Sequence, residues 1–169
     1  MITEELKEDL KDLSGLLDLE IELHEDLKRN LERKLDAIGE RNMENLEKLV
    51  KVEEEIVSKI EEVEDERSII VERIADELNV SKDLKAFDLC EILPAPFSTD
   101  LMLKFAKLME LLNDISLLNM CVRGLLEFES SYIDFTLRLL SGRMNENIYT
   151  KTGREKNLSS SSTFLDGRV

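Results

Sequence analysis

Leucines recur at steps of three and four residues along the first forty positions of the chain. Apolar residues at this spacing lie on one face of an α-helix. No proline interrupts the stretch and Thr3 is a suitable N-cap residue, so the pattern predicts a long amphipathic helix over residues 3–38. The apolar positions form two series that are slightly out of phase, namely Leu6, Leu10, Leu13 and Leu17, then Leu19, Leu23, Leu27, Leu31, Leu35 and Ile38.

The same periodicity resumes after a short break and predicts a second long helix over residues 43–79. Gly39 is a suitable C-cap for the first helix, and Asn42 is a suitable N-cap for the second. A connection of about three residues forces the two helices to lie antiparallel, as a hairpin. Because each residue of a helix adds 1.5 Å, both helices are expected to be roughly 50 Å long.

A short connector helix is expected over residues 82–93, after Ser81. The sequence Pro94-Ala95-Pro96 is expected to end it, because proline cannot continue a helix.

A third long helix is predicted over residues 99–141, with Ser98, Thr99 or Asp100 as its N-cap. It contains no proline, and Gly142 follows it. Its expected core stripe consists of Leu101, Phe105, Leu108, Leu112, Ile115, Leu118, Val122, Leu126, Ile133 and Leu140.

Residues 142–169 differ in composition from the rest of the chain. They are rich in Ser, Asn, Lys, Arg and Gly and have no apolar periodicity, which predicts a flexible, disordered tail. The whole chain has six glycines, two prolines and 5% aromatic residues, which leaves little material for a β-sheet. We therefore predict an all-α fold over residues 1–141: an elongated antiparallel hairpin, a connector helix and a third long helix, packed as a coiled-coil-like bundle.

The charge balance narrows the classes of partner. The 169 residues carry 23 Lys and Arg against 38 Asp and Glu, a formal net charge of -15. Such a surface repels nucleic acid and anionic lipid, so neither is expected as a partner. With no apolar run near membrane length and no signal-peptide pattern, a cytoplasmic location is expected. Cys90 and Cys121 are expected to be reduced and buried as small apolar residues.

No pattern in the sequence points to catalysis, and no metal or cofactor is expected. His24 is the only histidine, so it cannot complete a zinc pair, and we expect it on the polar face of the first helix. A nucleophilic triad would depend on this one imidazole, and no glycine-rich phosphate loop is present. The acidic run over residues 53–66 lacks the spacing of a calcium loop and is expected to be a solvated helix face.

The last long helix is apolar over about half of its circumference. A second stripe lies about 125° from the core stripe, with Leu125 between the two. A helix that serves one core needs an apolar arc of roughly 100°, so the surplus needs another cover. That cover is either further core, a second subunit or a client, and Glu129 within the surface indicates that it is not fully sealed. The second stripe consists of Leu117, Cys121, Phe128, Tyr132, Phe135 and Leu139.

Several segments together resemble the FlgN family of flagellar type III export chaperones. The hairpin turn reads Ala37-Ile38-Gly39-Glu40 and the second helix closes with Glu77-Leu78-Asn79-Val80. The last helix contains Leu117-Leu118-Asn119 and ends Leu139-Leu140-Ser141-Gly142. The tail then has Tyr149 four residues before Gly153, a serine run and Leu165-Asp166-Gly167-Arg168-Val169. The chain departs from the family at Asn79, where glycine is frequent, and at its Pro-Ala-Pro sequence.

The resemblance implies a cytoplasmic, non-enzymatic chaperone for hook-associated proteins, the hook-filament junction proteins. It would prevent their premature assembly and deliver them to the membrane export gate of the flagellar type III apparatus. The resemblance also implies that Tyr149 and Gly153 form a gate-docking motif. An apolar helix face suits helix-forming client termini, so we expect the client surface at Val122, Leu125, Leu126, Phe128, Tyr132, Phe135 and Leu139. The alternative is a structural coiled-coil or scaffold protein that acts as a homodimer through the same stripe.

Overall fold

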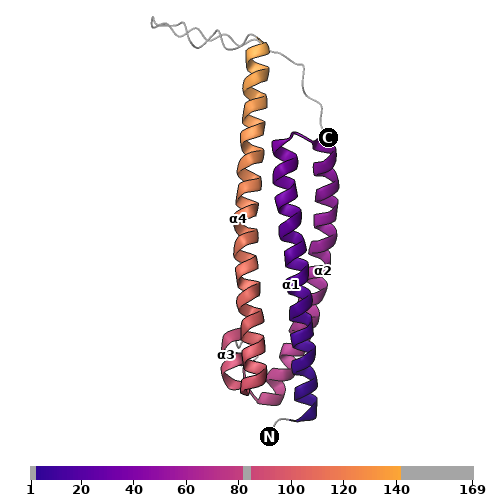
Figure 1. Ribbon diagram of the computed structural model, residues 1–169, viewed down its shortest axis with the longest axis vertical. Coiled ribbons are helices and arrows are strands. Elements are labelled where there is room, and N and C mark those ends of the chain that lie inside the picture. The colour runs from indigo at the N-terminus through magenta and orange to yellow at the C-terminus, as the bar shows by residue number, and fades with distance from the viewer. Residues whose placement is uncertain (1–2, 82–84, 142–169) are drawn as a thin grey trace, which may run out of the picture. The chain divides into compact units, whose positions relative to one another are not determined.

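The computed structural model describes residues 3–81 and 85–141, and nearly all of them are helical (Figure 1). The helices are α1 (Glu4–Gly39), α2 (Met43–Leu78), α3 (Ala86–Ile92) and α4 (Ala95–Leu140). The predicted all-α class is confirmed. The chain divides into two compact units, Met1–Glu129 and Ser130–Val169, so the first unit holds α1 to α3 and most of α4.

Helices α1 and α2 lie side by side as the predicted hairpin (Figure 1). Both predicted N-caps are confirmed, because Thr3 Oγ1 accepts the Leu6 N–H at 3.0 Å and Asn42 Oδ1 accepts the Asn45 N–H at 3.1 Å. Each cap satisfies a backbone N–H that has no partner within the helix.

The predicted C-cap at Gly39 is wrong, because α1 runs through Gly39 and Arg41 takes the left-handed conformation (φ 56°). The Asn42 N–H bonds the Ala37 carbonyl and the Arg41 N–H bonds the Ile38 carbonyl, which is a Schellman motif. In this motif the left-handed residue stands two positions after Gly39. Asn79 is also left-handed (φ 51°), and asparagine tolerates that conformation better than most residues, which accounts for it where the family often has glycine.

Helix α3 begins at Ala86, and the expected start of the connector at residues 82–84 lies outside the described residues. Helix α4 begins at Ala95, four residues earlier than predicted. Pro96 is accommodated because the first turn of a helix needs no intrahelical N–H donor. The Pro94 carbonyl accepts from the N–H groups of Phe97 and Ser98, at 3.1 and 3.0 Å. The predicted N-cap at Ser98, Thr99 or Asp100 is wrong, because all three residues lie inside α4. The Ser98 hydroxyl donates to the Cys90 carbonyl at 2.6 Å instead.

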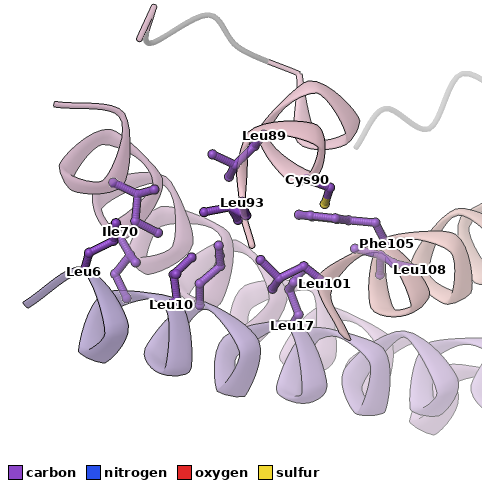
Figure 2. Packing of buried hydrophobic residues seen from close by; sticks show 12 residues of the cluster. Leu6, Leu10, Leu17, Ile70, Leu89, Cys90, Leu93, Leu101, Phe105 and Leu108 are labelled. Atoms are coloured by element: carbon purple, nitrogen blue, oxygen red, sulfur yellow. The ribbon is translucent and has the colours of Figure 1, made fainter. Parts of the chain in front are cut away.

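The core of the first unit consists of two apolar clusters. The α3-end cluster draws side chains from all four helices, and Figure 2 shows three residues of the α3 region pointing toward α1, α2 and α4. It consists of Leu6, Leu10, Leu13, Leu17, Ile70, Ile74, Leu89, Cys90, Leu93, Leu101, Phe105 and Leu108. The hairpin-end cluster consists of Leu23, Leu27, Leu31, Ala37, Ile38, Leu46, Leu49, Ile60, Val63, Ile115 and Val122.

Polar side chains lie on α1 and α2 between the positions of the two clusters. Arg67 Nε donates to Glu20 Oε1 at 2.6 Å, and Glu20 is fully buried. His24 is also buried, with Nδ1 2.7 Å from the Glu20 carbonyl oxygen, so its predicted place on the polar face is wrong. The reason is that His24 stands seven residues after Leu17 and seven before Leu31, which places it on the apolar stripe of α1.

Candidate functional site

Exposed apolar side chains gather on α4 in the first unit. They occur on the described helices elsewhere too, but α1 has only Leu19 among its exposed large apolar residues. On α4 between Ala95 and Glu129 they are Met102, Leu103, Met109, Leu112, Leu117, Met120, Leu126 and Phe128. All of these residues except Leu112 and Leu126 lie within a sector of about 120° on the helix and form one apolar face. An apolar face of this length is uncommon on a protein that has no partner, so it marks a candidate binding surface.

The opposite side of α4 is fixed to the hairpin by polar contacts. Lys104 Nζ bonds Asp18 Oδ2 at 2.7 Å and the Ser14 hydroxyl at 2.6 Å, and Lys28 Nζ bonds Asp114 Oδ2 at 2.6 Å. The hydrogen bond to Asp114 raises the pKa of Lys28 above its ordinary value. Contacts along this side set the rotation of α4 about its axis, and the apolar face therefore points outward.

The turn between α1 and α2 supplies an ion-pair partner for Glu129, the carboxylate within the apolar surface of α4. Arg41 Nε donates to Glu129 Oε2 at 3.1 Å, and the Glu129 side chain is 20% exposed. The left-handed Arg41 thus links the turn between α1 and α2 to α4, and the carboxylate within the apolar surface has a cationic partner.

The predicted client residues of the first unit have two different environments. Val122 is buried in the hairpin-end cluster, and Leu125 packs partly buried against it. Leu126 and Phe128 are exposed, Phe128 by 63%. Val122 is therefore a core position in this conformation, whereas Leu126 and Phe128 are available to a partner.

The described part of the second unit is the end of α4, from Ser130 to Leu140, together with Ser141. Tyr132, Phe135 and Leu139 are all exposed in it. The Thr136 hydroxyl donates to the Tyr132 carbonyl at 2.9 Å, a local bond within the helix. The predicted gate-docking residues Tyr149 and Gly153 lie outside the described residues, as does the whole predicted tail.

Comparison with known families adds an independent observation. The model of the FlgN protein family matches residues 1–157, which is nearly the whole chain. The chain belongs to the FlgN family. No match was found among curated proteins or among solved structures. As a FlgN-family protein it has the general role of a flagellar export chaperone, and the family binds flagellar hook-associated proteins.

Sequence reasoning missed part of the apolar face of this FlgN-family chain. Met102, Met109 and Met120 are exposed on α4, and neither predicted stripe included them. The signal was available, because residues at steps of three and four from Met102 to Phe128 are apolar or small, with the single exception of Asn113. They are Met102, Ala106, Met109, Leu117, Met120, Gly124 and Phe128. Methionine side chains are flexible and fit partners of varied shape.

The structure also bears on the expectations about metal binding, membrane spanning, the acidic run and the two cysteines. No group of His, Cys, Asp or Glu among residues 3–81 and 85–141 has the arrangement to hold a metal ion. Over the same residues, no helix is long and apolar enough to cross a membrane. The acidic run of α2 is solvated as predicted, since all its carboxylates are exposed except that of Glu53, which is partly buried. Cys90 is buried and burial raises the pKa of its thiol, but Cys121 is exposed, so its predicted burial is wrong.

Proposed function

We propose that this protein is a cytoplasmic chaperone that holds hook-associated proteins in an unassembled state and delivers them to the flagellar export gate. The observation that carries the proposal is the outward apolar face of α4, on a chain whose family binds such clients. A client terminus that forms an amphipathic helix would lay its apolar side on this face, as helix-in-groove recognition does. Binding orders the client segment, and that cost keeps the affinity low enough for release.

The proposed client contacts are the exposed members of the predicted set. Leu126 and Phe128 supply them in the first unit, and Tyr132, Phe135 and Leu139 supply them in the second. Val122 and Leu125 support the surface from the core side, since both pack against the hairpin. Large aromatic side chains contribute strongly to interfaces, so we expect the two phenylalanines to dominate the affinity.

The test is a calorimetric titration of the full chain with terminal fragments of hook-associated proteins from the same organism. Phe128→Glu with Phe135→Glu is expected to abolish binding, because two charges would be buried against the client. Both side chains are about half exposed or more, so helicity measured by circular dichroism should not change. The matched control is Val52→Glu with Ile69→Glu, which places two carboxylates at exposed apolar positions of α2.

If the variant with both Phe128→Glu and Phe135→Glu still binds the fragments, the client surface does not lie on α4. Loss of helicity would instead show that these residues are core. A wild-type chain that binds no fragment and has the mass of a stable dimer in light scattering would favour the homodimeric scaffold.

The proposed gate-docking motif has its own test. Tyr149→Ala is expected to weaken docking on the export gate while client binding is unchanged, and normal docking would exclude the motif.

A further inference from the structure

A mixed stripe of apolar and acidic side chains faces outward on the first half of α2. Apolar residues recur in it every seven positions, and a glutamate stands four positions after each of them. At 100° per residue, the six side chains lie within a sector of about 80° on the helix. All six are exposed, the apolar ones by 66, 39 and 38% in chain order. The mixed stripe consists of Met43, Glu47, Val50, Glu54, Val57 and Glu61.

The start of the mixed stripe is hollowed. A shallow groove of about 330 Å³ runs along it, and buried Leu46 connects this groove to the hairpin-end cluster. Because the core supports one side of the groove, a side chain seated in it would contact a rigid apolar surface. The groove is lined by Met43, Leu46, Glu47, Val50, Lys51 and Glu54.

The glutamates of the mixed stripe differ from neighbouring carboxylates in the ion pairs that they form. Among the neighbouring carboxylates on α2, Glu44 pairs with Lys48 and Glu53 pairs with Lys34. Within the described part of the chain, Glu47, Glu54 and Glu61 form no ion pair. Their charge is therefore available to a partner that brings lysine or arginine.

The negative charge of the mixed stripe favours one class of binding partner. A second copy of this chain would set glutamates against glutamates, and like charges across an interface are repulsive. Nucleic acid and anionic lipid are repelled for the same reason. A helix with an apolar residue every seven positions and a basic residue four positions later matches both the spacing and the sign of the stripe. We propose that the mixed stripe docks a basic amphipathic helix of a partner protein, separately from the client surface on α4.

The probe for this proposal is a synthetic helical peptide titrated against the full chain. The peptide has three heptads, with leucine at the first position and lysine at the fifth position of each heptad, and alanine and glutamine elsewhere. A control peptide has the same composition, but its lysines lie on the face opposite to the leucines. Fluorescence anisotropy is expected to show at least about tenfold tighter binding of the first peptide. Equal binding of the two peptides would overturn the proposal, because the pattern would then not be recognised.

Charge-matched variants separate the stripe from the general acidity of the protein. Glu47→Lys with Glu54→Lys is expected to weaken binding of the first peptide by at least about tenfold. The control is Glu55→Lys with Glu62→Lys, which changes the net charge by the same amount at exposed positions about 110° from the centre of the mixed stripe on α2. The control should weaken binding less than about threefold. An equal loss in both variants would attribute the affinity to net charge and overturn the proposal.

Discussion

Glu20 brings a carboxylate into the interior of the helical bundle, where only one of its oxygens has a partner. Oε1 accepts from Arg67 Nε at 2.6 Å, whereas the buried Oε2 has no hydrogen-bond partner in the described structure. Burial raises the pKa of Glu20, and the Arg67 charge opposes this only in part. The pair lies between the two apolar clusters. It is not expected to stabilise the fold, because the cost of removing both charges from water offsets their attraction.

Removal of Arg67 alone should therefore be costly. Arg67→Ala leaves a buried carboxylate without its cation, and we expect a loss of about 3 kcal/mol in the free energy of unfolding, measured with urea. Replacement of both residues by leucine should restore or exceed the wild-type stability, because two apolar side chains need no desolvated charge. Arg29→Ala is the control, since its ion pair with Asp26 is exposed and should contribute less than about 1 kcal/mol. A double-leucine variant less stable than Arg67→Ala would contradict this account.

The same carboxylate predicts a pH dependence. Because the folded pKa is raised above the ordinary 4.5, the folded state retains a proton that the unfolded state has already lost. Glu20 therefore lowers the free energy of unfolding progressively as the pH rises from about 4.5 through the folded pKa. Glu20→Gln cannot titrate, so the stability of wild type relative to this variant should fall over that window. Parallel stability curves between pH 4.5 and 7.5 would show that Glu20 keeps its ordinary pKa.

At the scale of a single element, α4 shows how a core stripe drifts around a long helix. Buried positions follow a seven-residue repeat through Leu101, Leu108, Ile115 and Val122. This spacing averages 3.5 residues per turn against 3.6 for the helix, so the buried face rotates by about 20° in each heptad. Leu112, a member of the predicted core stripe, is 47% exposed, whereas Leu111, which neither predicted stripe included, is 3% exposed.

Leucine-to-alanine substitutions at positions 111 and 112 test which of the two side chains faces the core. Leu111→Ala should lower the free energy of unfolding by about 2–4 kcal/mol, because it leaves a cavity in a packed interior. Leu112→Ala should cost less than about 1 kcal/mol, because the side chain is half exposed already. Chemical denaturation of both variants gives the comparison, and equal losses would contradict the assigned phase of α4.

Features that depend on a few neighbouring residues were predictable from the sequence. The N-caps at Thr3 and Asn42 follow from local hydrogen bonding, and the helix spans follow from apolar spacing. The burial of His24 also follows from spacing, because His24 stands seven residues from both Leu17 and Leu31, and it was missed because histidine is a polar residue type. For the candidate site, the exposed aromatic residues of α4 were found by periodicity. The inward position of Val122 was not, because a wide apolar face does not show which edge meets the hairpin.

At the scale of the whole molecule, the net charge of -15 acts against the compact state. Repulsion among unpaired carboxylates is screened by salt, since the Debye length falls from about 10 Å at 0.1 M to about 3 Å at 1 M. We expect an increase of about 1 kcal/mol in the free energy of unfolding between 0.02 and 0.5 M sodium chloride, measured by urea titration at fixed pH. A decrease would mean that ion pairs such as Lys104 with Asp18 outweigh the repulsion.

The two cysteines give the molecule a built-in reporter of its own opening. Cys121 is exposed on α4, whereas Cys90 is enclosed in the α3-end cluster and its backbone carbonyl is held by Ser98. A thiol reagent should therefore modify Cys121 at once. It should reach Cys90 only when α3 separates from the hairpin. The slow phase of labelling would then time the release of this end of the bundle, without any probe being added to the sequence.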